Sequence, residues 1–199
     1  TLLAVTLLYA DPVLSHLNPD YSQYTRLLNT YVSTDGVRYA AWIQHAEDVA
    51  RLQDFVVNLG QTDMDTLSMD ARKALYINLY NAAMLQAVLD HYPIKSVKAI
   101  GLLPFAIFKR NFIPLGDDMV SLDDVEKGIL LKRYSDPRIH FAVNCASQSC
   151  PPLRAEPFIA SRLKAQLDEQ TALFARSDRA ARIYPGQRSI AYSELFNWY

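Results

Sequence analysis

The sequence is poor in glycine and cysteine, and its charges nearly cancel. Its 199 residues include 6 glycines and 2 cysteines, and 20 Lys+Arg stand against 21 Asp+Glu, which gives a formal net charge of -1. No basic run interleaved with aromatic residues occurs, so nucleic-acid binding is not expected. A chain of this length buries about 70% of its extended-chain surface, so it needs neither a metal nor a disulfide framework to fold.

Long apolar runs and linker-like stretches are also missing. No window approaches the roughly 20 apolar residues that a transmembrane helix needs, so no membrane span is expected. No Gly/Ser-rich or Pro-rich stretch divides the chain, in which hydrophobic residues make up 50% and charged residues 21%. These proportions are typical of a folded globule, and we expect residues 1–199 to form a single domain.

The run Thr1–Ala10 is apolar but short, and it lacks a basic n-region. If it were the remnant of a signal peptide, Leu8 would stand where a small residue is needed before cleavage at Ala10. We therefore expect this run to be an ordered first element of the domain.

Apolar periodicity predicts a helix-rich α+β domain with a small β-sheet or hairpins. A first helix opens at Asn18-Pro19-Asp20, which offers a cap, a proline in the first turn and an acid. A second helix ends at Gly60. Residues 112–120 and 183–192 each predict a short hairpin, because apolar runs flank turn-forming residues.

Residues 68–92 predict a long central helix. Within residues 74–89, only Asn78, Asn81 and Gln86 are strongly polar, and a helix that is apolar nearly all round must be buried nearly all round. Asn78 and Asn81 share one face. A buried amide without partners costs about 1–3 kcal/mol, so either a neighbouring loop or a ligand must bind these two side chains.

Residues 121–133 predict a shorter helix. Ser121 and Asp124 have the spacing of a capping box at its start. Glu126 lies on the apolar face of this helix, four residues after Leu122 and four before Leu130. An acid on the packing side of a short helix is a candidate functional residue.

Residues 138–145 alternate between apolar and polar side chains, which indicates a half-buried strand. This parity places Cys145 on the apolar side and His140 on the other side. Loop-forming residues follow over 146–152 and include Cys150. The pattern therefore brings a histidine and two cysteines to one region of the domain.

Three ordered motifs carry a resemblance to a known family. They are Tyr76-Ile77-Asn78-Leu79-Tyr80-Asn81-Ala82, then Ser121-Leu122-Asp123-Asp124-Val125-Glu126-Lys127-Gly128-Ile129-Leu130, and Asp136–Ser147 followed by Ser149-Cys150-Pro151. In this order they resemble domain-of-unknown-function family 547, over residues 20–199. The resemblance implies export in many bacterial relatives, and it supplies no established substrate.

The candidate site has the residues of a thiol enzyme. A catalytic cysteine needs an imidazole that lowers its pKa and a further group that orients the imidazole. Cys150, or alternatively Cys145, would be the nucleophile, His140 the base and Glu126 the orienting acid. Asn144 could stabilise an oxyanion. This hypothesis predicts that Glu126 and His140 lie within reach of a direct or water-bridged hydrogen bond.

The competing hypothesis is a disulfide between Cys145 and Cys150. Two cysteines this close in sequence commonly pair in an oxidising compartment, which requires Cα atoms within about 7 Å. With only His140 beside them, they fall one ligand short of a structural zinc site, so no metal or cofactor is expected. Arg138 and Arg154 flank the loop and are candidates for binding a carboxylate.

Two classes of function therefore follow from the sequence. One is a thiol-dependent hydrolase or acyl-transferase that acts on a peptide-like amide. The other is a non-catalytic binding or scaffold domain of the cell envelope, held by the disulfide. In either case the expected partner is a small molecule or a peptide-like ligand.

Overall fold

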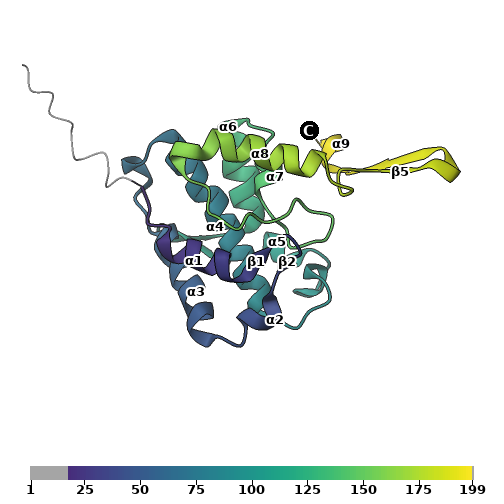
Figure 1. Ribbon diagram of the computed structural model, residues 1–199. Coiled ribbons are helices and arrows are strands. Elements are labelled where there is room, and N and C mark those ends of the chain that lie inside the picture. Colours follow the sequence, from purple (N-terminus) through teal and green to yellow (C-terminus); the bar gives the residue numbers. More distant parts are fainter. Residues whose placement is uncertain (1–17, 199) are drawn as a thin grey trace, which may run out of the picture.

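Helices form most of the molecule, and short antiparallel hairpins complete it (Figure 1). The computed structural model describes residues 18–198, so the expected element over Thr1–Ala10 lies outside the described residues. The architecture confirms the predicted helix-rich α+β class. Its β part consists of separate hairpins: β1 pairs with β2, β3 with β4 and β5 with β6.

The elements follow one another with short connections. The helices are α1 (Ser22–Tyr31), α2 (Tyr39–Trp42), α3 (Ala46–Gly60), α4 (Met69–Asp90), α5 (Ala106–Lys109), α6 (Lys132–Tyr134), α7 (Ile139–Ala142), α8 (Leu163–Ala175) and α9 (Leu195–Trp198). The strands are β1 (Val32–Ser33), β2 (Gly36–Val37), β3 (Ile113–Leu115), β4 (Asp118–Val120), β5 (Ala181–Tyr184) and β6 (Ser189–Tyr192). Tighter or wider helical turns are η2 (Met64–Thr66), η3 (Val97–Ala99), η4 (Asp124–Leu131), η5 (Ala160–Arg162) and η6 (Pro185–Gln187).

The predicted central helix is α4. Every side chain from Ala74 to Leu85 is buried, and the helix packs against α3, η4, η5 and α2. The hydroxyl of Ser68 caps the helix by accepting a hydrogen bond from the Ala71 N–H. Because α4 is apolar nearly all round, it can be accommodated only inside the molecule. None of the helices within residues 18–198 is long and apolar enough to cross a bilayer.

The first buried amide of α4 ties down a distant loop. The Asn78 side chain donates to the carbonyl of Phe158 at 2.8 Å and accepts from the N–H of the same residue at 2.9 Å. Both groups are buried, so each would lose a hydrogen bond without the other. The prediction that Asn78 must be hydrogen-bonded is confirmed, and its partner is backbone.

The prediction of a strand over residues 138–145 is wrong. Residues 139–142 instead form the short helix α7, which follows the turn at Asp136-Pro137. Val143, directly after the helix, has an extended backbone. A strand needs the backbone of a neighbouring strand, whereas here the side chain of Asn81 bonds the carbonyl of Ala142 and the N–H of Asn144. The parity argument that favoured Cys150 over Cys145 as a nucleophile therefore has no basis.

The helix predicted over residues 121–133 is present, but most of it is wider than an α-helix. Ser121 and Asp124 form the expected capping box, in which Ser121 N–H and hydroxyl both donate to the Asp124 carboxylate. From Asp124 to Leu131 the backbone is a π-helix, and its buried residues Val125 and Leu130 are five apart. Glu126 lies in this wide stretch.

Two further hairpins agree with the sequence. The predicted hairpin over residues 112–120 is β3–β4, and that over residues 183–192 is β5–β6. The second extends away from the helical body (Figure 1), and both of its strands are exposed. It leads into α9, whose first residue, Leu195, returns to the body.

Asp136 holds the start of α7 in place. Its carboxylate accepts hydrogen bonds from Arg138 at 2.8 and 2.9 Å and from Lys73 of α4 at 3.2 Å. The hydrogen bonds from Arg138, together with the one from Lys73, lower the pKa of Asp136 from its usual 3.8 to about 2. The folded state therefore favours the ionised form of Asp136. The Asp136 side chain is only 10% exposed.

We predict that Asp136→Asn lowers the free energy of unfolding at neutral pH by about 2 kcal/mol. The lowered pKa stabilises the fold above the unfolded-state pKa of 3.8, and this contribution is lost as pH falls through about 2. Urea titrations at a series of pH values should therefore show the two proteins converging in acid. The control Asp54→Asn, on the exposed face of α3, should match the parent protein. A difference that persists unchanged into acid would contradict this account.

Candidate functional site

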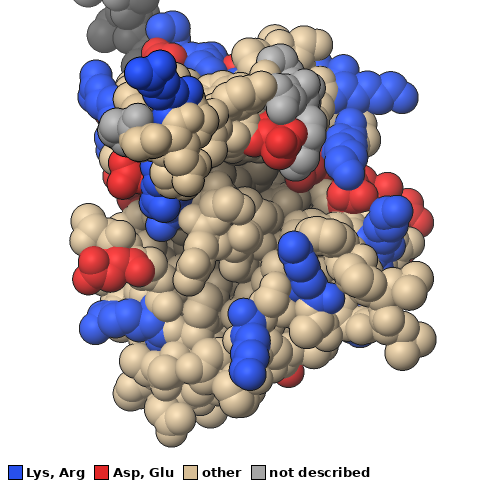
Figure 2. All heavy atoms as spheres, turned by 90° about the vertical axis from the view of Figure 1, so that its right-hand side faces the viewer, with Lys and Arg blue, Asp and Glu red and all other residues tan. Residues whose placement is uncertain are grey.

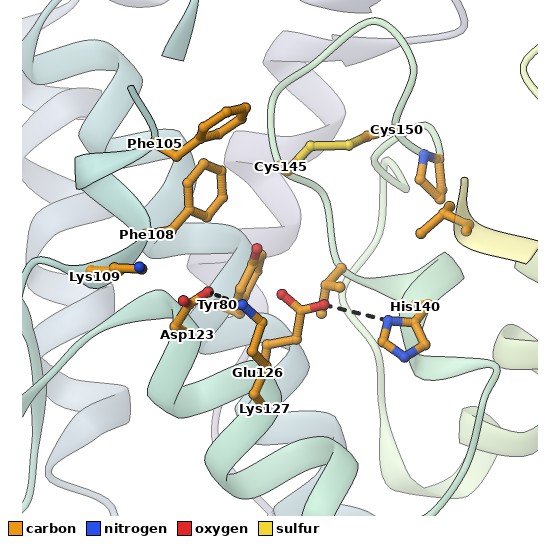
Figure 3. A pocket seen from close by; sticks show the side chains of 13 residues that line it. Tyr80, Phe105, Phe108, Lys109, Asp123, Glu126, Lys127, His140, Cys145 and Cys150 are labelled. Atoms are coloured by element: carbon orange, nitrogen blue, oxygen red, sulfur yellow. Dashed lines mark hydrogen bonds and ion pairs between the residues drawn. A yellow bond between two sulfur atoms is a disulfide. The ribbon is translucent and has the colours of Figure 1, made fainter. Parts of the chain in front are cut away.

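One cavity of about 530 Å³ brings the predicted catalytic residues together (Figure 3). Its walls come from α4, α5, η4, α7, the loop after α7 and α9. The lining side chains are Tyr80, Phe105, Phe108, Lys109, Asp123, Glu126, Lys127, His140, Val143, Cys145, Cys150, Pro151 and Leu195. Apolar and aromatic groups thus surround a small set of polar ones, as in many small-molecule sites.

Glu126 and His140 form a polar pair in this cavity. The Glu126 Oε1 atom lies 3.4 Å from His140 Nδ1, and the two side chains are 17% and 2% exposed. This distance is longer than the usual N–H···O hydrogen bond of about 2.9 Å. The two residues belong to different helical elements, η4 and α7, so tertiary packing brings their side chains together. Their predicted proximity is confirmed.

Tyr80 extends from α4 toward the same carboxylate (Figure 3). The side chain is 1% exposed. Burial raises the pKa of the Tyr80 hydroxyl well above its usual value, and the charge of Glu126 raises it further. Tyr80 is therefore a neutral hydroxyl at physiological pH, beside an acid that can accept its proton in a hydrogen bond.

Cys145 and Cys150 are joined by a disulfide, with their Cα atoms 6.2 Å apart. The predicted closeness of the two residues is confirmed, and neither carries a free thiol in this structure. Both line the cavity that contains Glu126 and His140. The disulfide therefore closes a loop that forms part of the cavity wall (Figure 3).

A chain of hydrogen bonds connects α4 to this loop. The Asn81 side chain donates to the Ala142 carbonyl at 2.9 Å and accepts from the Asn144 N–H at 2.8 Å. Asn144 in turn donates to the Pro151 carbonyl at 2.7 Å and accepts from the Ala146 N–H at 2.9 Å. The loop is thus closed twice, by the disulfide and by the Asn144 amide. That amide is engaged within the loop and not directed at an oxyanion.

Aromatic side chains form another part of the wall. The rings of Phe105 and Phe108 lie with centroids 6.3 Å apart. Figure 3 shows Lys109 near them, on the side of the cavity away from His140. A ligand in this cavity would meet flat apolar surfaces on this side and the Glu126–His140 pair on the other.

The predicted carboxylate-binding arginines lie outside the cavity lining. Arg138 binds Asp168 of α8 at 2.6 Å in addition to Asp136. Arg154 binds Glu156 at 2.5 Å and Glu169 at 2.9 Å. Carboxylates of the chain itself therefore occupy both guanidinium groups, which bind α7 and the loop after it to α8.

Sequence reasoning missed Tyr80 and the aromatic wall. Tyr80 stands directly before Asn81 in the first family motif, so its position was a signal that could have been used. Phe105 and Phe108 belong to a stretch without clear periodicity. Their part in the site follows only from the packing of α5 beside η4 and α4.

A family model described as a protein of unknown function, DUF547, matches residues 64–175. This chain belongs to the DUF547 family. No curated protein and no solved structure matches it. The matched DUF547 segment contains α4, η4, α7 and the disulfide loop, and it ends before β5–β6 and α9.

Within residues 18–198, no group of three or more His, Cys, Asp or Glu side chains is arranged to hold an ion. The two sulfur atoms are bonded to each other, and a thiolate is the form of cysteine that binds metals.

We predict that Asn81→Leu lowers the free energy of unfolding by about 1–3 kcal/mol, because it leaves backbone groups of residues 142 and 144 without partners. Urea denaturation measures the loss, and hydrogen exchange of the Asn144 amide should become faster than in the parent protein. The matched control is Asn58→Leu, on the exposed face of α3. Equal denaturation midpoints for Asn81→Leu and the parent would contradict the proposed role.

Proposed function

We propose that this DUF547 domain binds a small peptide-like ligand in the cavity around Glu126 and His140. The observation that carries the proposal is the position of this largely buried polar pair in a cavity whose wall also contains the aromatic rings of Phe105 and Phe108. Burying a polar group is costly unless it is hydrogen-bonded, and within residues 18–198 no arginine or lysine forms an ion pair with Glu126. A carboxylate here can accept a hydrogen bond from a ligand N–H.

The lining indicates the chemistry of the ligand. Phe105 and Phe108 offer flat surfaces for an aromatic or aliphatic side chain. Glu126 accepts from an amide or amine N–H, and the Tyr80 hydroxyl lies beside it. A residue of a peptide, with an apolar side chain and an amide, fits both requirements. The volume of about 530 Å³ is in the usual range for small ligands.

Binding explains the site better than thiol catalysis does. A cysteine nucleophile must be a thiolate, and the Cys145–Cys150 disulfide removes both thiols. The same disulfide stabilises the wall of a preformed cavity, because it limits the conformations of its loop in the unfolded chain. A structural disulfide also fits an oxidising compartment, so we propose that the protein is exported.

A thiol-dependent hydrolase or acyl-transferase is the second candidate, for the reduced protein. The observation in its favour is that Glu126, His140 and both cysteines line one cavity. If the disulfide were reduced, His140 could take the proton of a neighbouring thiol while Glu126 steadied the imidazolium. The redox state in the native compartment separates this candidate from the binding domain.

We predict that N-acetyl-phenylalanine amide, used as a probe, shifts the NMR signals of residues that line the cavity. Glu126→Gln should weaken this binding by roughly tenfold to a hundredfold, because a hydrogen bond to a charged group contributes about 1.5–3 kcal/mol. The control Glu47→Gln, exposed on α3, should bind like the parent. The proposal fails if the probe perturbs no lining residue, or if Glu126→Gln binds it with unchanged affinity.

We further predict that the protein isolated under non-reducing conditions does not react with iodoacetamide unless it is first reduced. After mild reduction, the second candidate requires an alkylation rate with an inflection well below pH 8, moved upward by His140→Ala. Mass spectrometry of peptides that contain Cys145 and Cys150 measures both rates. A native protein that reacts without reductant would favour the thiol enzyme over the binding domain.

A further inference from the structure

A long stretch of the chain carries only positive charge. No Asp or Glu stands between Asp90 and Asp117, whereas this stretch contains Lys95, Lys98, Lys109 and Arg110. The chain as a whole has a formal net charge of -1. A cationic segment within a nearly neutral protein is therefore a local feature and does not reflect the overall composition.

The same stretch exposes large apolar side chains at its tip. Leu102 is 101% exposed, Leu103 71% and Phe105 50%. These residues belong to the connection between η3 and α5, which we call the 101–105 loop. Single exposed apolar residues are common, but two adjacent exposed leucines close to an exposed phenylalanine are a costly arrangement for a domain in water.

The body of the domain anchors this loop at both ends. Ile100 and Ile107 are each 2% exposed and belong to the hydrophobic core. Gly101 has a φ of 103°, and a side chain there would lie 2.7 Å from Cβ of Ala106. Phe105 has a φ of 66°, which is unfavourable for a bulky residue. The leucines are therefore presented by an ordered turn.

Basic residues flank the apolar tip in the sequence, and one of them lies over Phe105. Lys98 lies over the ring of Phe105, with its Nζ 5.0 Å from the ring centroid. Lys109 is the last residue of α5 and Arg110 follows it, and Lys98, Lys109 and Arg110 are all exposed. Figure 2 shows the face on the right-hand side of Figure 1, where blue side chains are scattered over mostly uncharged atoms in the lower half.

We propose that the 101–105 loop docks this domain onto an anionic lipid surface. The loop would insert Leu102 and Leu103 among the lipids, while Lys98, Lys109 and Arg110 bind the charged headgroups. Exposed apolar residues that are flanked by exposed basic residues are complementary to the apolar interior and negative surface of such a membrane. This inference stands on the loop and is independent of the ligand proposed above.

Charge favours a lipid surface over a contact between the 101–105 loop of one copy and the β5–β6 hairpin of another. The exposed hairpin β5–β6, the other apolar projection, also carries arginines at positions 182 and 188, so contact between projections of two copies would oppose like charges. An anionic membrane attracts all the basic groups around the 101–105 loop at once. Docking would also bring the cavity close to the membrane, because Phe105 and Lys109 line it.

Co-sedimentation of the full chain with vesicles tests the proposal. Vesicles of phosphatidylcholine alone should bind weakly, and vesicles that also contain phosphatidylglycerol should bind strongly and lose the protein at high salt. Leu102→Ser with Leu103→Ser should lower the partition coefficient at least about tenfold. Lys98→Gln with Arg110→Gln should lower it about fivefold for each charge removed.

Matched controls lie on the β5–β6 hairpin, where Ile183 and Ile190 are 68% and 62% exposed. Ile183→Ser with Ile190→Ser, and Arg182→Gln with Arg188→Gln, should bind vesicles like the parent protein. Equal binding to neutral and anionic vesicles, or binding that survives the loop substitutions, overturns the proposal. So does sedimentation equilibrium that shows a dimer abolished by the loop substitutions, which would make the occupant a second copy.

Discussion

Two asparagine side chains on the buried central helix are the constraint on which the site depends. Asn78 and Asn81 each bind backbone groups of a distant segment, at Phe158 and at residues 142–144. These segments have no neighbouring strand to satisfy their buried N–H and C=O groups. The two amides take over that task, so α4 is the core of the domain and, through Asn81, also the support of the loop that forms part of the cavity wall.

The disulfide constrains the same loop by a bond within the loop itself. Asn81 fixes the backbone where the loop begins, Asn144 spans the loop, and the Cys145–Cys150 bond closes it. Such a preformed wall reduces the ordering that a ligand must impose, which favours binding. It also leaves neither cysteine with a free thiol in this structure, although both line the cavity with Glu126 and His140.

The cavity and the 101–105 loop share one short element. α5 contributes Phe108 and Lys109 to the cavity wall, and its N-cap residue, Phe105, both lines the cavity and forms part of the exposed tip. A contact made by the loop therefore acts on residues that a ligand would touch. This arrangement would couple the proposed membrane contact of the 101–105 loop to the proposed ligand site, because the two share Phe105 and are joined by α5.

The sequence by itself determined the burial of α4, the need of its two amides for partners, the β3–β4 and β5–β6 hairpins, the capping box at Ser121 and the closeness of the cysteines. Each of these follows from local pattern or short spacing. Tertiary structure alone decided that residues 139–142 form a helix. Asn81, more than sixty residues earlier in the chain, forms hydrogen bonds with the Ala142 carbonyl and the Asn144 N–H, which in a strand would pair with a neighbouring strand. It also decided that Phe105 and Phe108 face Glu126, because no periodicity within a segment specifies which surfaces of different segments meet.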